Sequence, residues 1–217
     1  MSKPLTIELL QKEASIFAKR ESKHPEPTLF GVTDGKAVGT YLEQKFQTLL
    51  HGRYVYGRGN AAKGIDFPGL NVDIKVTSIR QPQSSCPFKS ARQKIYGLGY
   101  SLIVFVYEKH DDQKMRTGRL DIKHAIFVEK EQTADHQTTS GLRQLVKNKA
   151  NRDDILAFFQ ERMLPVDEIE AETLADEVLR NPPEVGYLTV SNALQWRLQY
   201  GRVIEQAGKI GGILRLV

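Results

Sequence analysis

The sequence predicts an α/β protein in which a mixed β-sheet is flanked by helices. Residues 101–107 form a near-continuous apolar run bounded by polar residues, as in a central strand covered on both faces. Residues 5–21 and 36–50 carry apolar side chains at helical spacing and should pack against that sheet. After residue 130 helical patterns predominate, so we expect a helical C-terminal region.

Length and composition indicate one soluble domain, or one domain with a small appendage. The chain has 217 residues, of which 40% are hydrophobic and 26% charged. No apolar run approaches the roughly 18 residues of a membrane span, and the N-terminus lacks the apolar core of a signal peptide. A single cysteine, Cys86, excludes an intrachain disulfide and a cysteine metal cluster. We expect a cytoplasmic protein with no membrane partner.

Two amphipathic helices are expected near the N-terminus. The first covers residues 5–21, with Thr6 or Ser2 as its N-cap, and the second covers residues 36–50. Glu43 lies at the edge of the second helix's apolar stripe and could point toward the sheet. The alternative is a solvated glutamate beside Lys45. The apolar stripes are Leu5, Leu9, Leu10, Ala14 and Phe17 in the first helix and Val38, Leu42, Phe46 and Leu49 in the second.

Residues 64–78 carry the strongest functional signal. They predict two short extended pieces joined by a turn at Pro68 and Gly69. In the second piece Asp73 and Lys75 alternate with apolar residues and share one polar face. Asp66 ends the first piece and could reach that same face.

Two carboxylates and an ammonium would therefore converge beside an apolar sheet. Close carboxylates repel, and one would tend to take up a proton unless a cation joins them. Mg²⁺ favours one or two carboxylates plus waters. Lys75 could then orient an attacking water or help to deprotonate it. The alternative is a structural hairpin in which Asp73 and Lys75 face solvent.

Asp66, six intervening residues and then Asp73-Ile74-Lys75 resemble the active-site motif of the PD-(D/E)XK nuclease superfamily, and within it a type II restriction endonuclease. The resemblance covers residues 30–130 and includes the order of helices and strands. Ile65 stands where the motif has proline, which the superfamily tolerates. The resemblance implies a restriction-endonuclease-like mixed sheet, with Asp66, Asp73 and the Ile74 carbonyl as metal ligands. It also implies that Glu43 can join the site.

The function implied is Mg²⁺-dependent hydrolysis of double-stranded DNA at a specific sequence. A palindromic site would be cut most simply by a C2 homodimer, because the symmetries of protein and DNA then match. Two alternatives stay open. One is a repair or structure-specific nuclease or nickase that uses the same site, and the other is a DNA-binding protein without catalytic activity.

Basic residues supply candidate contacts to the DNA backbone. The formal net charge of +5 suits a polyanionic partner, although many basic proteins bind no nucleic acid. A glycine-containing loop over residues 57–64 and a helix over residues 89–98 are the basic segments nearest the motif. Gln93 and Tyr96 are one residue too close to match a Q-x-x-x-Y signature that some relatives carry. The candidate phosphate contacts are Arg58, Lys63, Lys89, Arg92 and Lys94.

A second Asp-Ile-Lys, at Asp121-Ile122-Lys123, is a rival for the catalytic motif. It lies in a strand expected over residues 120–128, after a charged loop expected over residues 108–119. Only a loop acid, Asp112, precedes it, and no tight turn fixes the position of that acid. We therefore favour the first copy.

The C-terminal region is expected to hold helices over residues 141–149, 153–163 and 167–180, followed by a break at Asn181-Pro182-Pro183. Residues 190–201 resemble the recognition helix of a helix-turn-helix, and residues 209–216 a wing. The alternative is a packing helix that buries Leu194, Trp196 and Leu198. The division predicted is a nuclease core with an N-terminal helix over 1–130 and a helical region over 131–217, with a winged-helix-like element at about 186–217. Its candidate DNA contacts are Ser191, Asn192, Gln195 and Arg197.

Overall fold

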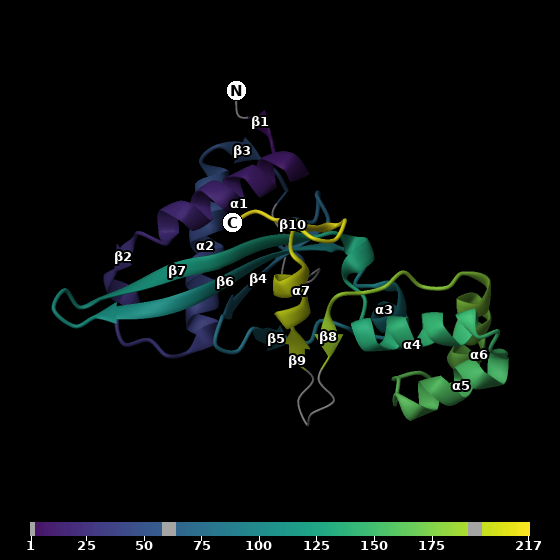
Figure 1. Ribbon diagram of the computed structural model, residues 1–217. Helices are drawn as coiled ribbons and strands as arrows, with labels where there is room; N and C mark the ends of the chain where they lie inside the picture. The colour runs from purple at the N-terminus through teal and green to yellow at the C-terminus, as the bar shows by residue number, and fades with distance from the viewer. Residues whose placement is uncertain (1–2, 58–63, 191–196) are drawn as a thin grey trace.

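A mixed β-sheet forms the centre of the protein. The computed structural model describes residues 3–57, 64–190 and 197–217 (Figure 1). The sheet has the strand order β10-β7-β6-β4, and β2 also pairs with β7. Only β4 and β6 are parallel within it, so the predicted mixed sheet is confirmed. Its strands are β2 (Pro25–Glu26), β4 (Val72–Ser78), β6 (Ser101–Asp112), β7 (Thr117–Val128) and β10 (Ile213–Arg215).

Two helices cover one face of this sheet, as the periodicity predicted. They are α1 (Ile7–Glu21), capped by the Thr6 side chain, and α2 (Gly35–His51), capped by Asp34. Phe17 and Phe46, one from each helix, pack on Phe105 of β6 with ring centroids 5.8 and 5.5 Å away. These contacts fix α2 against the sheet and so determine where its polar edge lies.

The other face of β6 packs on a separate group of segments. Alternate residues Leu102, Val104 and Val106 are buried there together with Leu198 and Val203. The prediction that this strand is covered on both faces is therefore confirmed. The covering segments are the helix α7 (Gly201–Gln206) and a small three-stranded sheet of β5 (Gln83–Ser85), β9 (Arg197–Gln199) and β8 (Thr189–Val190).

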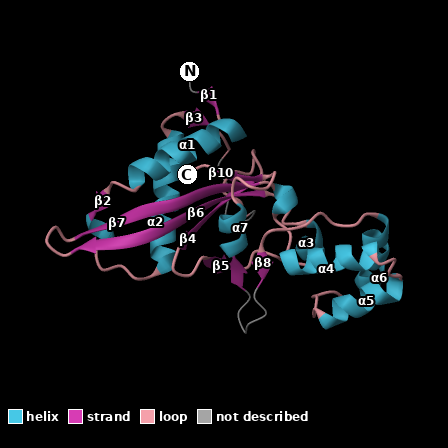
Figure 2. Ribbon diagram, viewed as in Figure 1, coloured by secondary structure: helices cyan, strands magenta, loops and turns pink. Residues whose placement is uncertain are grey.

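A group of helices lies beside the sheet and has its own apolar cluster (Figure 2). None of the helices in the described ranges is long and apolar enough to cross a membrane. The group consists of α3 (Ala91–Tyr96), α4 (His136–Lys147), α5 (Arg152–Glu161) and α6 (Glu168–Arg180). The remaining short elements are β1 (Lys3–Pro4), which pairs in parallel with β3 (Tyr54–Val55), and the 3-10 helices η1 (Pro27–Leu29) and η2 (Lys130–Gln132).

The prediction of a charged loop over residues 108–119 is wrong. β6 and β7 instead continue as a long antiparallel hairpin that projects away from α4–α6 (Figure 1). Its outer part is a ribbon in which oppositely charged side chains pair, with Lys123 3.2 Å from Glu108 and 2.6 Å from Asp121. Such pairs stabilise strands without an apolar pattern, which is why hydropathy missed them.

The prediction of a recognition helix over residues 190–201 is also wrong for the residues that the structure describes. Residues 197–199 form β9, and the helix α7 begins only at Gly201. Leu198 and Tyr200 are fully buried while Arg197 and Gln199 are not, which is the alternation of a strand. The strand β10, expected as a wing, instead pairs with β7 in the central sheet. The predicted division at residue 130 stays a prediction.

Candidate active site

A tight turn brings Asp66 and Asp73 together. Phe67 pairs antiparallel with Val72, and its backbone N–H donates to the Val72 carbonyl at 2.9 Å. The turn contains Pro68 and Gly69, as the sequence predicted. Asp66 therefore lies just before the turn, and β4 places Asp73 just after it.

The two carboxyl groups are in contact and are held by the backbone of the hairpin. The backbone N–H of Asp66 donates to Oδ1 of Asp73 at 3.4 Å, and Oδ2 of Asp66 accepts from the Ile74 N–H at 2.8 Å. Asp73 is only 3% exposed. Its Oδ2 lies 2.6 Å from Nζ of Lys75 but lacks a well-aligned hydrogen bond within the described residues.

The electrostatics of this pair favour an additional cation. The pKa of Asp66 is raised to about 7, mainly by burial and then by the hydrogen-bonded carboxyl of Asp73, with the Ile74 N–H acting in the opposite direction. Burial likewise raises the pKa of Glu43; the charge of Asp73 adds to this effect and that of Lys75 opposes it. The carboxyl groups of Asp66, Asp73 and Glu43 thus share a partly buried site with one ammonium group, that of Lys75. Asp66 and Asp73 supply the hard oxygen ligands and the surplus negative charge that suit Mg²⁺.

Sequence reasoning missed Gln47. Its side-chain Nε2 donates to Oδ1 of Asp66 at 2.9 Å, so each carboxylate oxygen of Asp66 has a donor. Gln47 lies four residues after Glu43 on α2, and side chains at that spacing share a helix face. Helical spacing from Glu43 could therefore have identified it.

A polar cleft of about 820 Å³ opens beside these residues. Glu43 and Lys75 line it, and its other walls come from the start of α2, the end of β4, and β5. It also contains Arg197, the one described member of the predicted C-terminal DNA contacts. Ser191, Asn192 and Gln195 lie outside the described residues, as do Arg58 and Lys63.

Both basic residues of α3 interact with other parts of the protein, although Arg92 is also exposed to solvent. Lys94 is 4% exposed and interacts electrostatically with Asp135 and Cys86. Arg92 forms a bidentate contact with Glu177 of α6. Lys89, just before the helix, is exposed. Of the three predicted phosphate contacts in this segment, Lys89 alone is both exposed and without such a contact in the described chain.

The second Asp-Ile-Lys copy lies on the exposed β6–β7 hairpin. Ligand atoms of Glu108, His110 and Asp121 lie within 4.8 Å of one another. Lys123 already pairs with both acids. Its hydrogen bond to Asp121 is the main reason that the pKa of this carboxyl lies below its usual range. This arrangement is a cluster on a surface hairpin, unlike the partly buried Asp66 beside the buried Asp73.

Comparisons with known proteins point to one family. The family model of the type II restriction enzyme NspV matches residues 4–215. The type II restriction enzyme NspV of Nostoc sp. (strain ATCC 29411 / PCC 7524) is 66% identical over 210 residues, which cover 97% of this chain and 96% of that protein. No solved structure shows a significant match.

Proposed function

The chain belongs to the family of the type II restriction enzyme NspV and is a site-specific DNA hydrolase, and we propose that Asp66, Asp73 and Lys75 perform the hydrolysis with Mg²⁺. The observation that carries this assignment is the contact between the partly buried Asp66 and the buried Asp73, with a lysine 2.6 Å from Asp73. A phosphodiester is a stable anion, so a site that hydrolyses it must neutralise charge and supply a nucleophile together.

Asp66 and Asp73 would hold the metal, with the carbonyl of Ile74 as a third ligand. A bound Mg²⁺ would neutralise charge on the phosphoryl oxygens and make a coordinated water more acidic. The hairpin keeps both carboxyl groups in place through the Ile74 N–H and the short turn. The metal requires both carboxylates in their charged form, so the proton that burial favours on Asp66 must leave first.

Lys75 would position the attacking water and offset charge on the phosphate. Its side chain is 24% exposed and lines the cleft, so Nζ can face Asp73 and a bound phosphate together. Glu43 lies near both Lys75 and Asp73 and lines the same cleft. We propose that Glu43 joins the metal site, directly or through a water.

The DNA would enter the cleft beside Lys75. Lys36 of α2 also lines this cleft and could contact a phosphate. We further propose that two copies of the chain act as a C2 homodimer, because each copy offers one hairpin site and both strands must be cut. A cytoplasmic location follows from the same proposal, since the DNA substrate would be met there.

The test is to incubate the protein with a long duplex DNA of known sequence. Discrete fragments with Mg²⁺ or Mn²⁺, and none with a chelator, are the expected result. Ca²⁺ should support binding with little cleavage, because its looser coordination positions the water poorly. Full cleavage in the chelator would contradict the metal mechanism. Cuts that follow nicks or damage rather than a sequence would favour a repair nuclease.

A further inference from the structure

The small sheet β5-β9-β8 has one apolar face and one polar face. In its register Ser85 pairs with Arg197, Gln83 with Gln199, and Thr189 with the other side of Gln199. Residues directly opposite one another project to the same side of a sheet, so these five polar side chains share a face. The alternate residues Leu198 and Val190 are buried in the apolar cluster against β6.

Part of this polar face lines the cleft that contains Lys75. Gln83, Ser85 and Arg197 line the cleft, and Ser85 and Gln199 are exposed. Within the described chain, the side chains of Gln83 and Gln199 form no hydrogen bond. Gln83 therefore offers an amide, with donors and an acceptor, within the cleft, and Gln199 offers a second amide directly opposite Gln83 on the same face.

The face is fixed in position relative to the catalytic strand. Oγ1 of Thr77, two residues after Lys75, donates to the Gln83 carbonyl at 3.0 Å and accepts from the Gln83 N–H at 2.9 Å. From the apolar side, Oγ of Ser84 lies 2.7 Å from the hydroxyl of the fully buried Tyr200. Because β5 is tied to both layers, a base held by Gln83 would be at a set distance from the phosphate beside Lys75.

We propose that this sheet, rather than a helix, reads the DNA sequence, with Gln83 and Gln199 as specificity-determining residues. The inference rests on the proposed hydrolysis of DNA in the same cleft. The major groove is wide enough for β-strands, and a glutamine amide matches the N6 donor and N7 acceptor of adenine. Gln83 and Gln199 therefore discriminate A·T pairs within the recognition sequence, and Arg197 lies on the same face.

The experiment measures sequence preference directly. Wild type, Gln83→Ala and Gln199→Ala are each incubated with Mg²⁺ and a library of duplex DNA carrying a randomised segment, and the cut ends are sequenced. Gln113→Ala is the matched control, because Gln113 is exposed in the distant turn of the β6–β7 hairpin. Thermal melting of each variant confirms that it is folded. Gln199 is exposed, so at least this variant is expected to fold normally.

We expect each of the two variants to lose preference at one A·T position of the site and to cut the wild-type sequence roughly 5- to 100-fold more slowly, while Gln113→Ala cuts like wild type. Unchanged preference and rate in both variants would overturn the inference and leave the proposed function intact. An equal fall in cleavage rate on all sequences would also overturn the inference, because that result would indicate that the glutamines contact the DNA backbone rather than bases. A wild type that cuts no duplex would overturn the proposed function and this inference together.

Discussion

The side-chain amide of Gln47 donates a hydrogen bond of 2.9 Å to Oδ1 of Asp66. The other oxygen of Asp66 accepts from the Ile74 N–H, so one carboxylate is held by the hairpin and by α2 together. Gln47 is neutral and supplies a donor without cancelling the negative charge that a metal needs. Groups that orient a metal ligand in this way affect metal affinity although they do not touch the metal.

Replacing Gln47 with alanine should therefore weaken the response to metal. We expect the Mg²⁺ concentration for half-maximal cleavage to rise about 10- to 100-fold, with a melting temperature close to wild type. The measurement is cleavage rate against Mg²⁺ concentration. Gln44→Ala, at an exposed position of the same helix, is the control and should behave like wild type. An unchanged Mg²⁺ dependence in Gln47→Ala would show that Gln47 does not position Asp66.

The raised pKa of Asp66 predicts how pH affects stability and metal binding. In the fold this pKa is about 7, against an ordinary value of 3.8. The metal-free protein should therefore lose stability as pH rises from about 4 through 7, because the buried carboxyl must ionise beside Asp73. Mg²⁺ binds the ionised form, so the stabilisation it provides should be larger at pH 8 than at pH 6.

Thermal melts with and without Mg²⁺ at pH 6 and pH 8 measure this difference. Asp66→Asn removes both the titrating group and a proposed metal ligand, so Mg²⁺ should shift its melting temperature little at either pH. A shift of equal size at both pH values in the wild type would mean that Asp66 does not release a proton when the metal binds.

Local signals made the hairpin predictable. The turn at Pro68 and Gly69 and the strict alternation after it place Asp66 and Asp73 side by side in any fold that buries Val72 and Ile74. The helices were predictable for a similar reason, since apolar spacing and caps such as Thr6 act over a few residues. The positions of these elements in space needed the structure.

Features that depend on tertiary contacts were not predictable. The sequence alone indicates a basic surface residue at Lys94, yet packing of α3 against α4 buries it near Asp135. The strands β5 and β9 have three residues each, which is too few to show an alternating hydrophobic pattern. They pair with each other although more than 100 residues separate them in the sequence. Tertiary pairing overrides weak local preference in such short segments.

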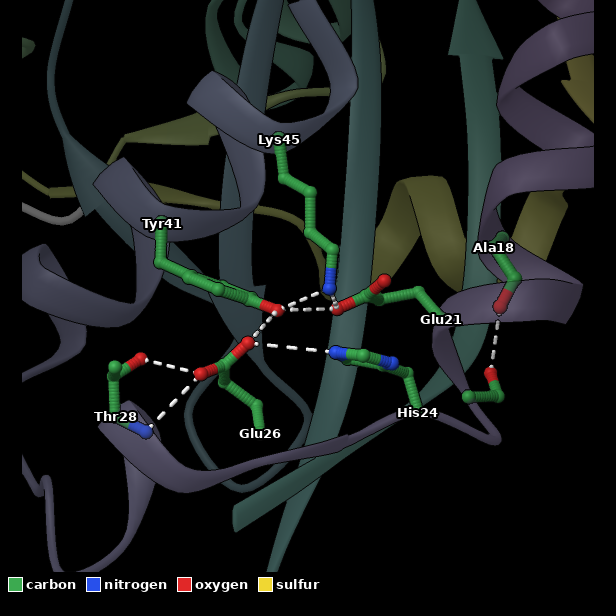
Figure 3. A network of polar contacts seen from close by, with 8 residues as sticks. Ala18, Glu21, His24, Glu26, Thr28, Tyr41 and Lys45 are labelled. Carbon is green, nitrogen blue, oxygen red and sulfur yellow. Dashed lines mark hydrogen bonds and ion pairs between the residues drawn. The ribbon is translucent and has the colours of Figure 1, made fainter. Parts of the chain in front are cut away.

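A partly buried polar network joins α1, α2 and the end of β2 (Figure 3). Glu21 at the end of α1 is 2% exposed, and its Oε1 accepts from Lys45 Nζ at 2.9 Å and from the Tyr41 hydroxyl at 2.8 Å. Oε2 of Glu26 lies 3.1 Å from the same hydroxyl, so the two carboxylates share its single proton. Because a buried carboxylate without its cation is costly, this network should stabilise the contact between the two helices.

Lys45→Met should leave Glu21 without its cation and lower the free energy of unfolding by about 2–3 kcal/mol, with Tyr41 still donating. Urea denaturation measures the change, and Lys12→Met at an exposed position of α1 is the control. The double variant Glu21→Gln/Lys45→Met should recover part of the loss, since the charge is then removed. Equal stability of Lys45→Met and wild type would contradict a stabilising role for the ion pair.

The two Asp-Ile-Lys copies differ in environment, which leads to opposite expectations for their aspartates. Asp73 is 3% exposed and in contact with Asp66, whose pKa is raised, and Lys75 is the only cation within ion-pair distance of it in the described chain. Asp121 lies on a surface ribbon, and Lys123 lowers its pKa. Each aspartate has a lysine 2.6 Å away, so the copies differ in burial and in the second carboxyl beside Asp73, and the buried pair gains more from a cation because water screens the charge of Asp121.

Asp73→Ala should therefore reduce cleavage at least about a thousandfold, because it removes a proposed metal ligand and its stabilisation of the transition state. It should leave the fold and much of the DNA binding intact, since it also relieves the repulsion with Asp66. Asp121→Ala should retain cleavage within roughly tenfold, a change in the barrier of about 1.4 kcal/mol. Cleavage time courses of both variants, with circular dichroism to confirm folding, make the comparison. A folded but inactive Asp121→Ala beside an active Asp73→Ala would move the catalytic site to the hairpin arm, where Glu108 and His110 would then be its other candidate ligands.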